Sequence, residues 1–287
     1  MKTRRYLLPW GVALPIVIVV ALLTVADTAK AALLFSDAFA YPNGPLAGNS
    51  GGTGWASSSA WAYTSGTSEN TVANPLPGTS GKSVRIAANA AVVSRPLSTT
   101  YVSGGTNAYY ISFGFNANPF QGLNNGMYAG VGVYLNADPS NNLFMGMPGS
   151  SGAFGFDWTG RGDPSASASD GTTYLALYKI SPGSGATTSV TMYATTNLLM
   201  SGTALAATTP WVSMLDDVGF SFDSVNVSGA YNTGSVNFAG LAMADNPTEA
   251  VAFTQTAVPE PSSLLLGALA VALGASAVPS CRRQRWL

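Results

Sequence analysis

Few residues of this 287-residue chain carry the side chains that catalysis usually requires. It contains no histidine, so the Ser-His, Cys-His and His-metal arrangements are excluded. Glutamate occurs at Glu69, Glu249 and Glu260, and no aspartate lies two residues after any of them. The Glu-x-Asp-x-x-Glu spacing of glucanases is therefore absent, although an aspartate pair stays open as the acid and base of glycoside hydrolysis. We predict no catalytic residue and no enzymatic activity.

Two other groups of residues have side chains suited to binding. Oxygen ligands of the kind that Ca²⁺ prefers occur in Asp138–Asn142 and at Asp216-Asp217, but a hairpin turn is the favoured interpretation of the first segment. Aromatic side chains suited to stacking on sugar rings are Trp55, Trp61, Trp158, Tyr63 and Tyr128. Burial in a core is the alternative for each aromatic residue. We predict no metal ligands and no cofactor, with calcium retained as an alternative.

The periodicity of the chain indicates that β-strands position these side chains. From Tyr109 to Asn116 the odd positions are aromatic or aliphatic, and most even positions are small or polar, as in a half-buried strand. Further strands are predicted at Gly126–Leu135, Tyr174–Ile180 and Ser189–Ala194. The side chains expected between two sheets are Ile111, Phe113, Phe115, Val131, Val133, Phe220 and Phe222.

Two changes of parity occur near the end of the chain. The apolar positions shift from Phe222 to Val225 across Asp223-Ser224, and they shift again after Phe238 across Ala239-Gly240. A parity change at a glycine indicates a β-bulge. About ten to twelve short strands with Gly, Pro, Ser and Asn turns predict an all-β fold, an antiparallel two-sheet jelly-roll sandwich. A short helical turn is predicted within 199–207, and no longer amphipathic helix.

The two ends of the chain carry export signals. Lys2, Arg4 and Arg5 precede the apolar run 10–25, and the small residues Ala29 and Ala31 predict signal-peptide cleavage after Ala31. Cleavage after Ala32 and an uncleaved membrane helix are the alternatives. The segment 3–8 is similar to a twin-arginine signal, but the short charged region favours the general secretory route.

The C-terminal end has three parts. The first part is a motif that its prolines hold extended, Val258-Pro259-Glu260-Pro261. The second part is an apolar span of about 262–281, which has the length that a membrane helix requires. The third part is a basic tip at 282–287. Arg282, Arg283 and Arg285 are expected to remain on the cytoplasmic side as a positive stop. We predict a signal peptide at 1–31, a β-sandwich domain at 32–257 and a sorting tail at 258–287.

The charge of the predicted domain is negative. Residues 32–257 contain five basic and eleven acidic residues, which gives a formal charge of −6. Such a charge argues against nucleic acid and anionic lipid as partners. The single cysteine, Cys281, lies in the tail, so the domain contains no disulfide bond.

The order of motif, apolar span and basic tip resembles the bacterial PEP-CTERM sorting signal, also described as the ice-binding protein C-terminal domain. This resemblance implies an exosortase-type processing enzyme as a partner, with Val258, Pro259, Glu260 and Pro261 as the sorting motif. An ordinary C-terminal membrane anchor is the alternative.

The domain itself also resembles a known group of proteins. The segments 37–46 and 51–55, with looser matches at 144–149 and 236–243, are similar to concanavalin A-like (LamG-type) jelly rolls. We therefore predict a non-enzymatic, exported cell-surface or extracellular-matrix protein, with a structural or adhesive role among extracellular polysaccharide. Its localisation is the cell envelope, anchored in the membrane before processing or released. The alternatives are a lectin-like carbohydrate-binding module, with or without Ca²⁺, and a divergent glycoside hydrolase.

Overall fold

The structure of the chain is a computed structural model that describes residues 32–255. Within this range it leaves out 67–69, 80, 87–90, 103–106, 119–127, 135–141, 149–152, 159–163, 183–186, 217–220 and 231–234. The predicted signal peptide and the sorting tail from Val258 onward, with their helices, lie outside the described residues. They remain predictions, as do the three domain boundaries.

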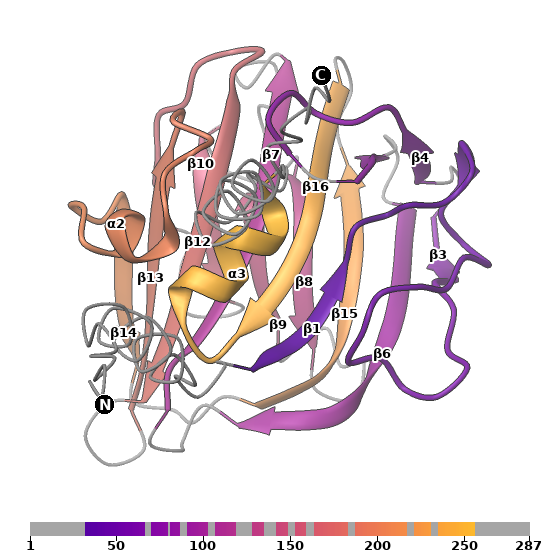
Figure 1. The fold of residues 1–287 in the computed structure, drawn as a ribbon, viewed down its shortest axis with the longest axis horizontal. Coiled ribbons are helices and arrows are strands. Elements are labelled where there is room, and N and C mark those ends of the chain that lie inside the picture. Colours follow the sequence, from indigo (N-terminus) through magenta and orange to yellow (C-terminus); the bar gives the residue numbers. More distant parts are fainter. Residues whose placement is uncertain are drawn as a thin grey trace, which may run out of the picture.

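The described strands form two antiparallel sheets (Figure 1). The nine-stranded sheet contains β1 (Leu33–Asp37), β2 (Gly44–Pro45), β4 (Thr71–Ala73), β5 (Ser83–Ile86), β7 (Tyr109–Asn118), β12 (Thr173–Pro182), β13 (Thr188–Thr195), β14 (Val212–Asp216) and β16 (Ser235–Ala244). The seven-stranded sheet contains β3 (Ala62–Ser65), β6 (Ala91–Val102), β8 (Tyr128–Tyr134), β9 (Asn142–Met147), β10 (Phe154–Trp158), β11 (Ser165–Ala166) and β15 (Ser221–Ala230). The long β12 and β13 pair as a hairpin, as the turn residues between them predict.

One apolar core fills the space between the two sheets. Period-two side chains from both sheets meet there, because successive residues of a strand point to opposite faces. The predicted core residues within the described chain are all buried: Ile111, Phe113, Phe115, Val131, Val133 and Phe222. Phe220 lies outside the described residues. The prediction of which strand faces point inward is confirmed at these six positions.

Both predicted changes of parity coincide with irregular strand pairing. In β15 the register shifts between Phe222 and Ser224, so Phe222 and Val225 both point into the core. In β16 the register shifts between Ala239 and Ala242, where Gly240 has a φ of 61°. Glycine adopts this left-handed conformation without steric cost, so the bulge at the second position is confirmed.

Two short helices cover the outer face of the nine-stranded sheet (Figure 1). The helix α2 (Gly202–Ala206) lies within the predicted helical turn, and Ser201 caps it by accepting a hydrogen bond from the Ala204 amide at 3.3 Å. The helix α3 (Pro247–Thr254) was not predicted; Asn246 caps it, and Pro247 occupies its first turn. Together with Leu175, Leu177 and Tyr193 of the sheet, these helices form a second, smaller apolar cluster.

The all-β fold of two antiparallel sheets agrees with a jelly-roll sandwich, but the expected number of strands was too low. The described residues contain sixteen strands, and β2, β4 and β11 have two or three residues each. Segments this short show no periodicity in a sequence, which explains part of the difference. Among the described residues, no helix has the length and apolar character needed to cross a membrane.

Candidate functional site

The outer face of the seven-stranded sheet carries polar and aromatic side chains, and no described helix covers it. Because Val93, Val131 and Val227 point into the core, their neighbours along each strand point outward. We name this surface the open face. Its side chains and glycines belong to β6, β15, β8, β9 and β10: Val92, Ser94, Pro96, Ser224, Asn226, Ser228, Tyr128, Gly130, Gly132, Tyr134, Asn142, Phe144 and Asp157.

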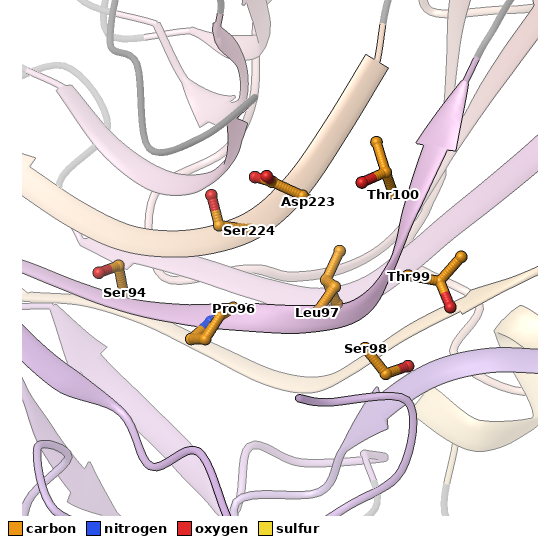
Figure 2. A pocket seen from close by; sticks show the side chains of 8 residues that line it. All are labelled: Ser94, Pro96, Leu97, Ser98, Thr99, Thr100, Asp223 and Ser224. Atoms are coloured by element: carbon orange, nitrogen blue, oxygen red, sulfur yellow. The ribbon is translucent and has the colours of Figure 1, made fainter. Parts of the chain in front are cut away.

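A pocket lies on the open face where β6 and β15 separate (Figure 2). Phe222 pairs with Tyr101 and Ser224 pairs with Pro96, so four residues of β6 lie opposite Asp223 alone. The pocket has a volume of about 350 Å³ and is lined by Ser94, Pro96, Leu97, Ser98, Thr99, Thr100, Asp223 and Ser224. Its walls therefore combine five hydroxyl groups with one carboxylate.

A second pocket of about 300 Å³ adjoins the first along the pair β15–β8. Ser224 of the first pocket pairs with Tyr134 of the second, and the Ser224 hydroxyl donates to the Tyr134 carbonyl oxygen at 3.0 Å. The lining residues of the second pocket are Val92, Tyr128, Tyr134, Asn142, Phe144, Pro148, Asp157 and Ser228. Tyr128 meets the edge of Phe144 with 5.4 Å between ring centroids. Both pockets thus belong to one polar surface with aromatic side chains.

Two asparagine side chains meet above Gly132 in the middle of the open face. The Gly132 amide donates to Asn226 Oδ1 at 3.1 Å. Asn226 Nδ2 and Asn142 Oδ1 are buried and have no hydrogen-bond partner among the described residues. Leaving such atoms unpaired costs about 1–3 kcal/mol each, so a hydroxyl group that bonds both would be favoured. A side chain at position 132 would not fit, since its Cβ would lie 2.6 Å from Asn226 Oδ1.

The two tyrosines of the open face are held in their neutral form. Burial, with a smaller contribution from Tyr128, raises the pKa of Tyr134 to about 12. Burial also raises the pKa of Tyr128. At neutral pH both phenol groups are protonated, as tyrosines ordinarily are, and can donate hydrogen bonds.

The carboxylates of the open face lie too far apart to act as a glycosidase pair. Asp157 of β10 and Asp223 of β15 are separated by β9 and β8, which places them about 14 Å apart across the sheet. Glycosidase carboxylates are separated by roughly 5–9.5 Å. Asp157 and Asp223 therefore cannot form such a pair.

A buried ion pair lies behind the same sheet, at its junction with the segment 37–55. Arg95 Nη1 lies 3.2 Å from Asp37 Oδ2, and Trp61 Nε1 donates to the same oxygen at 2.9 Å. The Tyr41 hydroxyl also donates to Asp37, and the Arg95 guanidinium lies 4.5 Å from the ring centre of Trp55. Burial raises the pKa of Asp37, opposed by these hydrogen bonds and by Arg95. Sequence reasoning missed this pair, because 58 residues separate its two members.

The predicted sugar-stacking residues divide between the core and the surface. Trp55, Trp61 and Trp158 are at most 8% exposed, so their alternative interpretation as core residues is correct. Tyr63 is 44% exposed on the edge strand β3, and Tyr128 lies on the open face. Sequence reasoning did not select Tyr134, Asn142 or Asn226 for this site, because the three residues come from β8, β9 and β15 and meet only through the pairing of these strands.

Most of the other predicted site residues cannot be placed. Asp138, Asp217, and the signal and tail residues Ala29, Ala31, Val258, Pro259, Glu260, Pro261, Arg282, Arg283 and Arg285 lie outside the described residues. Asn142 begins β9, and Asp216 ends β14 on the other sheet. Within the described chain, no three Asp, Glu, Cys or His side chains gather in a group suited to a metal ion.

Comparison with known proteins gives a likeness in fold. The sequence matches no model of a protein family and no curated protein. The structure is similar to the globular domain of T. cruzi calreticulin, with 12% identity, 75% of this chain and 94% of that chain covered, and a TM-score of 0.46. It is also similar to lectin II from Ulex europaeus, with 7% identity, 66% of this chain and 92% of that chain covered, and a TM-score of 0.40. A GH131 beta-glucanase catalytic domain from Podospora anserina is similar as well, with 11% identity, 66% of this chain and 88% of that chain covered, and a TM-score of 0.36. At these values the likeness concerns the sandwich alone, and a function must be argued from this chain's own side chains.

Proposed function

We propose that this chain is a non-enzymatic, exported surface protein whose β-sandwich binds carbohydrate through the open face. The observation that carries the proposal is the unpaired acceptor of Asn142 and the unpaired donor of Asn226, which are buried on either side of Gly132. A hydroxyl group, such as that of a sugar, can donate to the first atom and accept from the second. Tyr128 and Tyr134 add the aromatic surface and phenol donors that sugar rings require.

The charge of the open face favours a neutral glycan. Its described side chains include Asp157 and Asp223 and no lysine or arginine, while Arg95 of β6 points inward and pairs with Asp37. Acidic polysaccharides would be repelled at low ionic strength. The ligand class is therefore a neutral sugar polymer, contacted over both pockets.

The predicted sorting signal is consistent with a role at the cell surface. The Pro-Glu-Pro motif, the apolar span and the arginine tip would deliver the sandwich to an exosortase-type enzyme at the membrane. A protein placed there and bound to extracellular polysaccharide would act as an adhesive or structural component of the matrix.

The test is a glycan array probed with the full chain, purified in detergent, with and without EDTA. We expect binding to at least one neutral glycan, and the EDTA arm tests the alternative in which calcium takes part. Incubation with a polysaccharide panel tests hydrolysis: release of reducing sugar would contradict the non-enzymatic assignment. Absence of binding to every neutral glycan would leave a purely structural role as the better account.

A further inference from the structure

The segment 50–59 forms a fixed loop on the inner side of β6. Ser36 and Thr53 exchange two backbone hydrogen bonds of 3.0 Å, and the Ala56 amide donates to the Pro96 carbonyl at 3.1 Å. The Ser98 amide donates to the Gly54 carbonyl at 3.0 Å. These bonds attach the loop to β1 on one side and to β6 on the other, so its shape is set before any ligand arrives.

Two glycines allow the loop to lie this close to β1. Gly52 and Gly54 have φ values of 70° and 78°. A Cβ atom at position 52 would lie 1.8 Å from the Ser36 carbonyl oxygen, and one at position 54 would lie 2.0 Å from that of Leu34. Both the conformation and the close approach therefore require glycine.

The loop surrounds a pocket of about 310 Å³ that has Arg95 in its wall. Its other lining residues are Ser50, Gly51, Gly52, Thr53, Gly54, Trp55, Ala56, Ser57, Ser58 and Ser59. Arg95 is 4% exposed and lies on the opposite side of β6 from Ser94 and Pro96, so this pocket is separate from the open face.

Arg95, which lines the pocket, retains donor capacity. Its Nη1 donates to Asp37 Oδ2 and to the Gly51 carbonyl at 2.8 Å, and its Nε donates to Ser59 Oγ at 3.4 Å. Its Nη2 has no partner among the described residues, and this atom is not among the buried unpaired ones. A guanidinium carries five N–H donors, so two of them remain for a ligand.

The charges around Arg95 select the kind of anion. Asp37 lies directly behind the guanidinium and neutralises it, so the pocket presents a positive edge without a net positive charge. Asp37 repels the two charges of a phosphate dianion more strongly than the single charge of a carboxylate, which can accept a charge-assisted hydrogen bond from Nη2. The surrounding serine and threonine hydroxyls match the remaining hydroxyls of a sugar.

We infer that this pocket binds a uronic acid residue, with the sugar carboxylate on Arg95 and the ring hydroxyls on the serines of the loop. The site is independent of the open face and differs from it in ligand class. Each site has its own variants, so failure of one does not imply failure of the other.

The experiment is isothermal titration of the full chain in detergent with methyl β-D-glucuronide, methyl β-D-glucoside and inorganic phosphate. Small probes avoid the repulsion between a polyanion and the domain charge of −6. The glucuronide should bind at least about tenfold more tightly than the glucoside, since one charge-assisted bond is worth this much. Equal affinity for the two glycosides, or tighter binding of phosphate than of the glucuronide, would overturn the inference.

Variants at Ser57 test the location without disturbing the buried pair. Ser57 lines the pocket and is exposed, so Ser57→Asp should fold normally and repel the carboxylate, lowering glucuronide affinity by about tenfold. Ser57→Asn introduces an uncharged side chain of the same size as aspartate and should change the glucuronide affinity by less than about twofold. Ser65→Asp, on the exposed strand β3, controls for the added charge. An unaltered affinity in Ser57→Asp, or a loss of glucuronide binding in Tyr134→Ala, would contradict this placement.

Discussion

The buried hydrogen-bond environment of Asp37 could not be predicted from the residues next to it in the sequence. It is 1% exposed and accepts hydrogen bonds from Tyr41, Trp61, Arg95 and the Phe39 amide. The donors come from three separate segments, so they satisfy the carboxylate only after β1, the following loop and β6 have assembled. The opening segment 37–46 is therefore tied to β6 by charge as well as by apolar packing.

Removal of this carboxylate should destabilise the sandwich strongly. Asp37→Ala leaves the Arg95 guanidinium buried beside Trp55 without its counter-charge, and we expect a loss of about 3–5 kcal/mol in the free energy of unfolding. Chemical denaturation followed by tryptophan fluorescence measures this loss. The matched control is Asp245→Ala at an exposed position, with an expected change below about 1 kcal/mol. Similar losses in both variants would show that the buried pair has no special role.

The raised pKa of Tyr134 predicts a dependence of stability on alkaline pH. Unfolded tyrosine ionises near pH 10, whereas Tyr134 in the folded chain resists ionisation until about pH 12. The folded state holds more protons between these values, so the contribution of Tyr134 to stability is constant below about pH 10 and is lost as the pH rises from 10 through 12. Thermal denaturation at intervals from pH 8 upward should show a smaller fall in Tyr134→Phe than in the parent chain. Identical curves would mean that the phenol is not shielded as described.

At the scale of the elements, the apolar alternation of β7 and β8 defines the core, and one substitution tests this assignment. Phe113 is fully buried, stacks on Tyr178 at 5.5 Å between ring centroids and meets the edges of Phe115 and Phe238. Phe113→Ala should cost about 3–5 kcal/mol of unfolding free energy. Tyr63→Ala, on the exposed edge strand β3, is the control and should cost much less. A loss below about 1 kcal/mol for Phe113→Ala would show that this face does not point between the sheets.

The strands β7, β8, β12 and β13 could be predicted from the sequence because each buries period-two positions, whereas the longest strand, β6, was not predicted. The same alternation located both register shifts, since a bulge displaces the inward positions by one residue. The strands β2, β4 and β11 are too short to show a pattern, and pairing with distant segments determines them. The helix α3 had a local signal in Asn246 followed by Pro247 and Glu249, but its eight residues are too few for a helical period to stand out.

The candidate site could be predicted less well than the fold. The absence of histidine from the sequence excluded catalysis by that residue. Tyr128 was predicted as one of the aromatic residues that could stack on a sugar ring. The grouping of Tyr134, Asn142 and Asn226 depends on how β9, β8 and β15 are aligned, and the sequence does not specify that alignment. The three tryptophans were the most conspicuous sugar-binding candidates, and they are core residues because each has a large apolar surface to bury.

At the scale of the whole molecule, the two sheets differ in what covers them. The helices α2 and α3 cover the nine-stranded sheet, and α3 ends at Thr254, four positions before the first residue of the predicted tail, Val258. The open face belongs to the opposite sheet (Figure 1). The sandwich therefore keeps its candidate binding surface away from the side on which the described chain ends.

The sorting hypothesis predicts that Glu260 matters beyond membrane affinity. Glu260 precedes the apolar span, so Glu260→Gln leaves hydrophobic partitioning almost unchanged, because partitioning follows buried apolar area. A processing enzyme that reads the charge of the Pro-Glu-Pro motif should reject the variant. Replacement of Arg282, Arg283 and Arg285 should instead disturb topology. Expression of both variants in a host with the matching exosortase, followed by fractionation and intact-mass analysis, distinguishes a loss of processing from a change of topology. Normal processing of Glu260→Gln would favour a simple tail anchor.

The central claim, that the open face binds a neutral glycan, is tested most directly by titrating the full chain with a neutral glycan identified on an array. The double variant Tyr134→Ala/Asn142→Ala removes one aromatic surface and one unpaired acceptor from the second pocket. Asn74→Ala, at an exposed position just after β4 of the other sheet, is the control. We predict that the double variant, folded as judged by circular dichroism, loses at least about tenfold in affinity while the control matches the parent. Unchanged affinity in the double variant, or an equal loss in the control, would contradict the claim.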